Sequence, residues 1–250
     1  MKATDTYRLS FGKKIYRSVK AIVDFLIAFF ALIVLSPLFV IVAIAIKADS
    51  RGPVFFVQDR IGKGEKIFRC VKFRSMSVDA RHDIAGYEYQ DVQAYVTKVG
   101  AFIRKYSIDE LPQLFNVLTF KMSLIGYRPS QPSEKELNDA RAAHAMYQIR
   151  PGISGWAQVN GRDVLAAHPT QKAEYDAYYL QHLSPWLDIK ILFMTVIQVF
   201  KSDSVVEGVV TESKDDVTEE RSKAEAVTAV TDSTVVKTAD DECLKQKEVV

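Results

Sequence analysis

The sequence predicts a membrane-attached, mainly helical α+β protein with a small β-hairpin and interfacial amphipathic helices. Three observations lead to this fold class. Residues 25–46 form one uncharged apolar run, residues 53–76 hold two β-branched and aromatic runs around a glycine turn, and leucines recur at helical spacing from Leu111 to Leu118. The first pattern is typical of a membrane helix, the second of a hairpin and the third of an amphipathic helix.

Length and charge set the wider limits. The chain has 250 residues, of which 48% are hydrophobic and 26% charged, enough for one folded domain with appendages. Residues 1–201 carry a net charge of +9 and residues 202–250 carry −7. A basic body favours anionic partners, which include nucleic acid, a phospholipid surface and nucleotide phosphates. The two cysteines, Cys70 and Cys243, form neither a disulfide framework nor a metal-ligand motif, which fits a reducing compartment.

The apolar run 25–46 would cover about 30 Å as a helix, close to the thickness of a bilayer core. Six basic residues precede it within residues 1–20, a pattern that keeps an N-terminus on the cytoplasmic side. The run is longer than the core of a signal peptide, so cleavage is disfavoured. Membrane association is therefore the first functional expectation.

Ser36 and Pro37 lie in the middle of this run. Proline removes an amide donor and its ring crowds a carbonyl one turn back, so a sharp bend is expected here. Two arrangements are compatible with that bend, a kinked helix that spans the membrane and a re-entrant helix that turns back. Topology alone does not separate them.

After the membrane segment, the two strand-like runs surround Gly62-Lys63-Gly64 and predict a hairpin. The turn and second strand are basic. Lys72 and Arg74 are candidates for binding phosphate or lipid headgroups, and the alternative is a solvated edge face.

The segment 104–129 places two adjacent carboxylates, Asp109 and Glu110, between arginines, an arrangement that suits phosphate chemistry. A capping box formed by Ser107 and Glu110 is the competing explanation. Pro112 argues against that register, because proline prefers the first helical position. Capping and catalysis both stay open at this level.

Two features follow toward the C-terminus. The turn-rich stretch 150–162 can present backbone amides to phosphate, and it begins with Arg150, a further candidate for substrate phosphate. Residues 186–200 predict an apolar helix that lies either in the membrane interface or in the core. The tail, 202–250, has no aromatic residue and is expected to be disordered.

Four segments in order resemble the bacterial sugar transferase family, the small monotopic phosphoglycosyl transferases that start polysaccharide and glycoconjugate assembly. The resemblance covers roughly residues 15–200. It is carried by KADSRGPVFFVQDRIGKGEKIFRCVKFRSM, TKVGAFIRKYSIDELPQLFNVLTFKMSLIGYRP, RPGISGWAQVNGR and YDAYYLQHLSPWLDIKIL.

The resemblance implies transfer of a hexose-1-phosphate from a UDP-sugar to polyprenyl (undecaprenyl) phosphate with release of UMP, dependent on Mg²⁺, at the cytoplasmic face of the cell membrane. Asp109 matches the family's nucleophile and Glu110 its metal-associated partner. Arg104 and Arg128 match arginines of the same motif, and both are expected to hold substrate phosphates. Tyr127 departs from the family, which usually has proline there.

The resemblance also implies the domain plan. Ser36-Pro37 matches the break in a re-entrant helix-break-helix anchor, so the expected protein is monotopic. Residues 1–20 form a basic N-terminal segment, 21–47 the re-entrant helix, 48–201 the cytoplasmic catalytic domain and 202–250 the acidic tail. Membrane lipids and polysaccharide-assembly partners are expected, and nucleic acid is not.

Two other functions remain as alternatives. A membrane-attached glycosyltransferase would move the sugar without its phosphate and release UDP. A non-catalytic assembly component would use its charged tail to bind partners.

Overall fold

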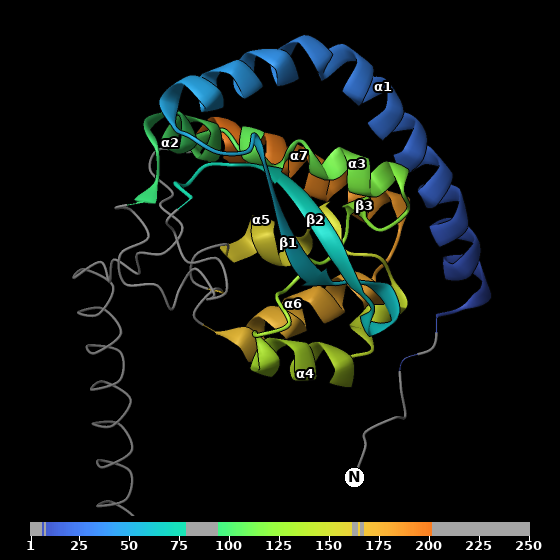
Figure 1. The fold of residues 1–250 in the computed structure, drawn as a ribbon. Helices are drawn as coiled ribbons and strands as arrows, with labels where there is room; N and C mark the ends of the chain where they lie inside the picture. Colours follow the sequence, from blue (N-terminus) through green and yellow to red (C-terminus); the bar gives the residue numbers. More distant parts are fainter. Residues whose placement is uncertain (1–6, 8, 79–94, 162–164, 166–167, 202–250) are drawn as a thin grey trace, which may run out of the picture. The chain divides into compact units, whose positions relative to one another are not determined.

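The computed structural model describes residues 7, 9–78, 95–161, 165 and 168–201. The acidic tail predicted to be disordered lies outside the described residues. The elements, drawn in Figure 1 and with η marking a 3₁₀ turn, are α1 (Phe11–Asp49), β1 (Phe55–Ile61), η1 (Lys63–Glu65), β2 (Ile67–Phe73), α2 (Lys98–Lys105), η4 (Ile108–Glu110), α3 (Gln113–Leu118), β3 (Ser123–Ile125), α4 (Lys135–Ala143), η5 (Met146–Gln148), β4 (Gly152–Ser154), α5 (Trp156–Gly161), α6 (Pro169–Gln181) and α7 (Pro185–Lys201).

Helix α1 continues through Pro37 without interruption. Proline has no N–H, so the Ile33 carbonyl loses the donor that position 37 would normally supply. The Ser36 hydroxyl donates to that carbonyl instead, at 2.8 Å. The helix is therefore not interrupted at Ser36-Pro37, and the re-entrant arrangement stays a prediction. The segment is one bent helix that arches over the other elements (Figure 1).

The inner face of α1 packs on the rest of the fold at several points along its length. Ala28 is completely buried in a cluster with Phe68 of β2 and Leu114 of α3. Further along, Ile46 lies in a second cluster with Phe73 at the end of β2. The middle and the C-terminal part of the helix are thus held by the same body.

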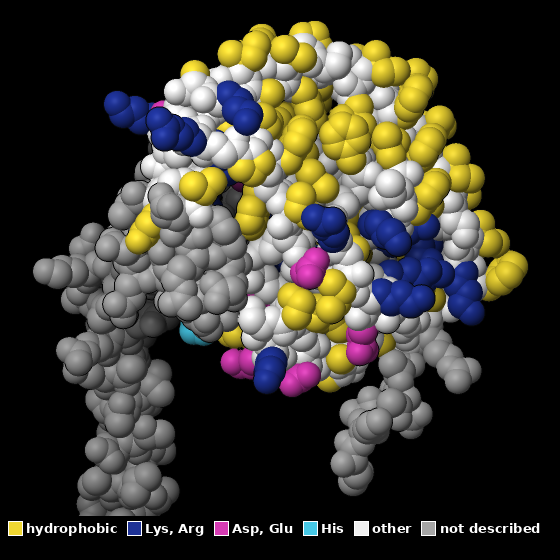
Figure 2. All heavy atoms as spheres, viewed as in Figure 1, with side chains coloured by type: hydrophobic (Ala, Val, Ile, Leu, Met, Phe, Trp, Pro, Cys, Tyr) yellow, Lys and Arg dark blue, Asp and Glu magenta, His cyan; other side chains and the backbone are white. Residues whose placement is uncertain are grey.

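The outer face of α1 is apolar and exposed. In the described part of the chain, α1 is the one helix long and apolar enough to cross a membrane, judged by length and composition. Figure 2 shows hydrophobic side chains covering the arch. Large contiguous apolar surfaces mark membrane or protein contacts, so the predicted membrane association agrees with this surface. The exposed residues include Ile22, Val23, Leu26, Phe30, Ile33, Val34, Val40, Ile41 and Ile44.

The predicted hairpin is confirmed. Strands β1 and β2 are antiparallel, with Phe55 opposite Phe73 and Ile61 opposite Ile67. The turn between them includes Gly64, whose φ of 70° lies in the left-handed region that glycine adopts without strain.

A second, two-stranded sheet pairs β3 with β4 in parallel. The backbones of its two strands approach so closely that no side chain fits at the glycine positions. A Cβ atom on Gly152 would lie 2.1 Å from the Gly126 amide, and one on Gly155 would lie 2.0 Å from the Gly126 carbonyl oxygen. The glycines of the turn-rich stretch therefore allow backbone packing.

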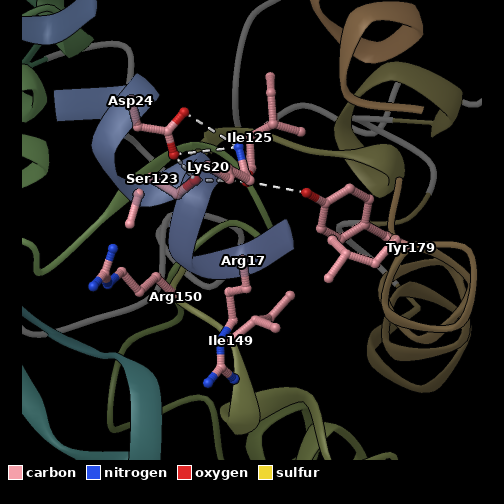
Figure 3. Close-up of a pocket in the computed structure, with 10 residues that line it drawn as sticks. Arg17, Lys20, Asp24, Ser123, Ile125, Ile149, Arg150 and Tyr179 are labelled. Atoms are coloured by element: carbon pink, nitrogen blue, oxygen red, sulfur yellow. Dashed lines mark hydrogen bonds and ion pairs between the residues drawn. The ribbon is translucent and has the colours of Figure 1, made fainter. Parts of the chain in front are cut away.

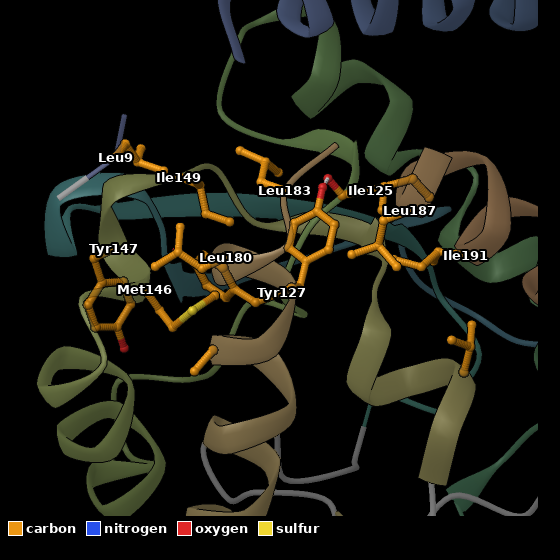
Figure 4. Packing of buried hydrophobic residues seen from close by; sticks show 13 residues of the cluster. Leu9, Ile125, Tyr127, Met146, Tyr147, Ile149, Leu180, Leu183, Leu187 and Ile191 are labelled. Carbon is orange, nitrogen blue, oxygen red and sulfur yellow. Dashed lines mark hydrogen bonds between the residues drawn. The ribbon is translucent and has the colours of Figure 1, made fainter. Parts of the chain in front are cut away.

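The largest core cluster lies beneath the sheets and joins the last helices to α1. Figure 4 shows Tyr127, Met146 and Leu180 among its members, together with Leu187 and Ile191 of α7. Helix α7 buries these two residues and leaves Trp186 and Phe193 exposed. The buried face agrees with the expected core helix, and the exposed apolar face leaves the interfacial position a prediction.

Candidate active site

Asp109 and Glu110 lie in η4, the single turn between α2 and α3. The Leu111 amide closes the turn on the Ile108 carbonyl at 3.1 Å. Pro112 follows at the position before α3, where its missing amide costs no helical hydrogen bond. The turn directs both carboxylates inward, so that Asp109 is 8% exposed and Glu110 7%.

Glu110 is held between two cations from distant parts of the chain. Its Oε1 atom lies 3.2 Å from Lys72 Nζ on β2 and 2.7 Å from Arg128 Nη1 in the turn after β3. All three side chains are largely buried, which strengthens their electrostatic interaction relative to a surface pair. The fold thus concentrates two negative and two positive groups in one buried place.

The capping-box alternative is wrong. Ser107 has a φ of 55° and its side chain makes no capping hydrogen bond. Helix α3 begins only at Gln113, so the carboxylates precede the helix and lie outside its first turn. The Glu110 side chain contacts Lys72 and Arg128, which a reciprocal cap would not require.

Arg74 occupies a structural position. Its guanidinium donates to the Ser50 carbonyl and hydroxyl, both at 2.8 Å, and to the Arg51 carbonyl at 2.5 Å. The side chain is 4% exposed. Arg74 therefore fastens the chain that leaves α1 to the end of the hairpin, whereas Lys72, two residues earlier, reaches the acid pair.

Arg104 and Arg150 lie in different surroundings. Arg104 is in the last turn of α2 and its Nη2 approaches Met76 Sδ at 3.8 Å. Arg150 lines a separate narrow pocket, and its guanidinium carbon lies 5.2 Å above the Phe120 ring. The Gly152 amide donates to the Tyr127 carbonyl, so this amide of the turn-rich stretch is not available to bind phosphate.

Sequence reasoning missed a polar network that joins α1 to the body. Figure 3 shows Lys20, Asp24 and Ser123 together in the Arg150 pocket. Lys20 pairs with Asp24 at 3.2 Å and with Asp188 of α7 at 2.9 Å. The available signal was Asp24 itself, a charge directly before a long apolar run that must find partners if it is buried.

The acid pair also fits a magnesium ion. Mg²⁺ favours one or two protein carboxylates completed by substrate phosphates and water. Asp109 and Glu110 supply two adjacent carboxylates, and no cluster of three metal-binding side chains occurs among the described residues. The donor set therefore matches a phosphate-bridged ion better than an all-protein cage.

Comparison with known proteins gives a family. A model described as bacterial sugar transferase matches residues 15–202. The chain is 46% identical over 185 residues to a UDP-N-acetylgalactosamine-undecaprenyl-phosphate N-acetylgalactosaminephosphotransferase of Aeromonas hydrophila, covering 73% of this chain and 44% of that protein. It is 39% identical over 190 residues to a UDP-glucose:undecaprenyl-phosphate glucose-1-phosphate transferase of Escherichia coli, covering 74% and 40%.

A shorter relative is matched over most of its length. The exopolysaccharide production protein ExoY of Sinorhizobium fredii is 37% identical over 187 residues, which cover 69% of this chain and 81% of that protein. The chain thus spans less than half of the two longer relatives and about four-fifths of the short one.

Proposed function

The chain belongs to the bacterial sugar transferase family, and from that premise we propose that it transfers a hexose-1-phosphate from a UDP-sugar to polyprenyl phosphate. One observation carries the proposal, the buried acid pair with Glu110 between Lys72 and Arg128. Two of the relatives are named as transferases that use UDP-N-acetylgalactosamine or UDP-glucose and undecaprenyl phosphate.

The proposed reaction has two displacements at one phosphorus. An Asp109 carboxylate oxygen attacks the sugar-linked phosphorus of the UDP-sugar, and the bond from that phosphorus to the bridging oxygen breaks, releasing UMP. An oxygen of polyprenyl phosphate then attacks the same phosphorus and releases the Asp109 carboxylate. The product is a polyprenyl-diphosphate-sugar, and one difficult transfer is divided into two easier ones.

The cations around Glu110 explain how Asp109 can act as a nucleophile. Two neighbouring carboxylates disfavour each other's ionised form, and nearby positive groups offset that repulsion. Lys72 and Arg128 lie against Glu110, so its charge is balanced before substrate binds. Arg104, in the preceding helix, is a candidate for the substrate phosphates, because guanidinium groups bind phosphate oxygens in pairs.

Magnesium is the proposed cofactor. Asp109 and Glu110 would hold it together with substrate phosphate oxygens, and it would offset the negative charge that accumulates as the phosphates meet.

Nucleotide release tests the reaction. Purified protein in detergent is assayed for UMP release with a panel of UDP-sugars. With polyprenyl phosphate present, release should continue over many turnovers. Without the acceptor, release should stop at about one UMP per enzyme molecule. Asp109→Asn should abolish release. Glu110→Gln should reduce release severely and should also lower the melting temperature, because it removes a counter-charge of the buried Lys72 and Arg128, so release is compared per mole of folded protein. UDP as product would identify the glycosyltransferase alternative, and undiminished UMP release by Asp109→Asn would exclude the nucleophile assignment.

We further propose that the protein is monotopic, with the body on the cytoplasmic face. Two contacts near the ends of α1 support this topology. Arg17 Nη1 donates to the Gln148 carbonyl at 2.7 Å, and the Val99 amide donates to Asp49 at 2.9 Å. A helix fixed to one body at both ends cannot also cross a bilayer that lies between those ends.

Cysteine labelling tests the topology. Ser18→Cys and Asp139→Cys, both at exposed positions, are introduced separately into a Cys243→Ser background that retains the buried Cys70. In intact cells neither should react with a membrane-impermeant maleimide, and both should react in inverted vesicles. Labelling of the two positions from opposite sides would contradict the monotopic topology.

A further inference from the structure

Three cations gather near the tip of the hairpin, at the N-terminal part of α1. Lys63 is in η1, which packs on η5, and Arg17 donates to the Gln148 carbonyl of η5 at 2.7 Å. Arg150 follows η5 by two residues and lines the same pocket as Arg17. Figure 3 shows both guanidinium groups in this pocket.

Arg17, Lys63 and Arg150 form no ion pair among the described residues. Two acids lie near them: Asp24, which attracts Arg150 but is paired with Lys20 and Ser123, and Glu65, in the same turn as Lys63. Burial together with the neighbouring Arg17 and Arg150 lowers the pKa of Lys63. Positive groups that outnumber the acids beside them favour an anion.

An aromatic stack leads from this site to the apolar face of α1. The Arg150 guanidinium carbon lies 5.2 Å above the Phe120 ring. Phe120 stacks on Phe25 with ring centroids 5.5 Å apart, and Phe25 stacks on Phe29 at 6.5 Å. Figure 2 shows lysine and arginine side chains gathered at the border of the hydrophobic surface.

We propose that Arg17, Lys63 and Arg150 bind the phosphate headgroup of an anionic membrane phospholipid, whose acyl chains lie along Phe120, Phe25 and Phe29. The combination fits an amphiphile, because a cluster of cations meets the head and stacked rings meet the chain. A soluble phosphate would gain nothing from the rings. The bound lipid would fix the depth and tilt of the N-terminal part of α1 at the membrane interface.

The site is separate from the acid pair. Lys63 lies at the tip of the hairpin, and Lys72, which contacts Glu110, lies near the other end of β2. That part of the strand spans roughly 17 Å at about 3.3 Å per residue. The phospholipid would therefore not occupy the position of the reacting phosphates.

Thermal unfolding of the full-length protein in a non-ionic detergent tests the site, because a ligand that binds the folded state raises the melting temperature. The probes are dihexanoyl phosphatidylglycerol, dihexanoyl phosphatidylcholine and glycerol phosphate. Only phosphatidylglycerol should stabilise the wild type. In Arg17→Gln/Lys63→Gln its apparent Kd should rise at least tenfold. The matched variant Lys47→Gln/Lys98→Gln removes two exposed charges near the other end of α1 and should respond within twofold of wild type.

If the double variant does not fold, the single variant Lys63→Gln replaces it in the test, because Lys63 lies in an exposed turn. This variant alone should bind phosphatidylglycerol more weakly than wild type. If both double variants lost the same affinity for phosphatidylglycerol, binding would depend on overall surface charge and not on this cluster, and the proposal would be overturned. Equal stabilisation by glycerol phosphate would also overturn it. Displacement of phosphatidylglycerol by a short polyprenyl phosphate would assign the cluster to the acceptor instead. Binding is measured without turnover, so these outcomes do not depend on the proposed reaction.

Discussion

Replacing Asp188 with Asn should loosen the N-terminal part of α1 from the body. Asp188 of α7 accepts hydrogen bonds from Tyr16 and Tyr179, both at 2.6 Å, and pairs with Lys20 at 2.9 Å. Tyr16 and Lys20 belong to α1, and Tyr179 belongs to α6. One carboxylate thus joins α1 to α6 and α7, which come much later in the sequence.

The expected magnitude follows from burial. The side chains of Lys20 and Asp188 are 11% and 12% exposed. Asp188→Asn removes one of the two carboxylates that pair with Lys20, because Asp24 remains at 3.2 Å, and it weakens the hydrogen bonds from Tyr16 and Tyr179. Breaking a buried pair outright costs about 3–5 kcal/mol, so we expect about 3 kcal/mol here. In a domain of this size each kcal/mol lowers the melting temperature by about 2–4 °C, so Asp188→Asn should melt roughly 6–12 °C below wild type. Circular dichroism in detergent measures the shift.

Two further variants make the reasoning falsifiable. Lys20→Met/Asp24→Asn/Asp188→Leu removes all three charges of the network and should melt above Asp188→Asn, because replacing a whole buried ionic set costs less than breaking it. Glu136→Gln changes an exposed residue and should shift the melting temperature by less than about 2 °C, as surface substitutions do. The reasoning fails if Asp188→Asn melts with wild type or if the triple variant is less stable than Asp188→Asn.

Two other outcomes are expected. Arg128→Lys should lower kcat/KM by about 10–150-fold, because it loses a charge-assisted hydrogen bond to Glu110 worth about 1.5–3 kcal/mol, while Lys135→Gln should leave steady-state kinetics unchanged. Burial, aided by Arg141, lowers the pKa of Lys172 from 10.5 to about 8. Between those values the unfolded chain binds a proton that the folded chain lacks, so wild-type stability should rise with pH. Below pH 8 the Lys172→Met variant should be more stable than wild type, and its stability should not rise between pH 8 and 10.5. Melting curves at several pH values measure both differences.

The elements that the sequence predicts well are those with a local cause. The hairpin follows from two β-rich runs and a glycine turn, and its register agrees with that pattern. The apolar run predicts the long helix because length and composition alone decide that feature. The helix after the acid pair begins two residues later than the leucine spacing indicates, since Pro112 can only precede it.

The features that escaped prediction depend on contacts between distant segments. Whether Pro37 interrupts a helix depends on what replaces its missing donor, and the neighbouring Ser36 hydroxyl supplies it. Lys72 on β2 and Arg74 just after that strand carry the same charge, yet Arg74 meets backbone carbonyls and Lys72 a carboxylate. No local pattern states which partner the fold brings to each.

Helix α1 and the turn that carries the acid pair pack into the same apolar cluster. Ile108, the residue before Asp109, packs against the cluster that contains Val42 and Ile46 of α1. The same cluster includes Phe73 of β2, the strand that carries Lys72 to Glu110. A change in how deeply α1 lies in the bilayer would therefore act on η4 and on β2 through direct apolar contacts. Under the proposed function this packing sets the height of the Asp109 carboxylate relative to the phosphate of a lipid acceptor, which is confined to the membrane surface.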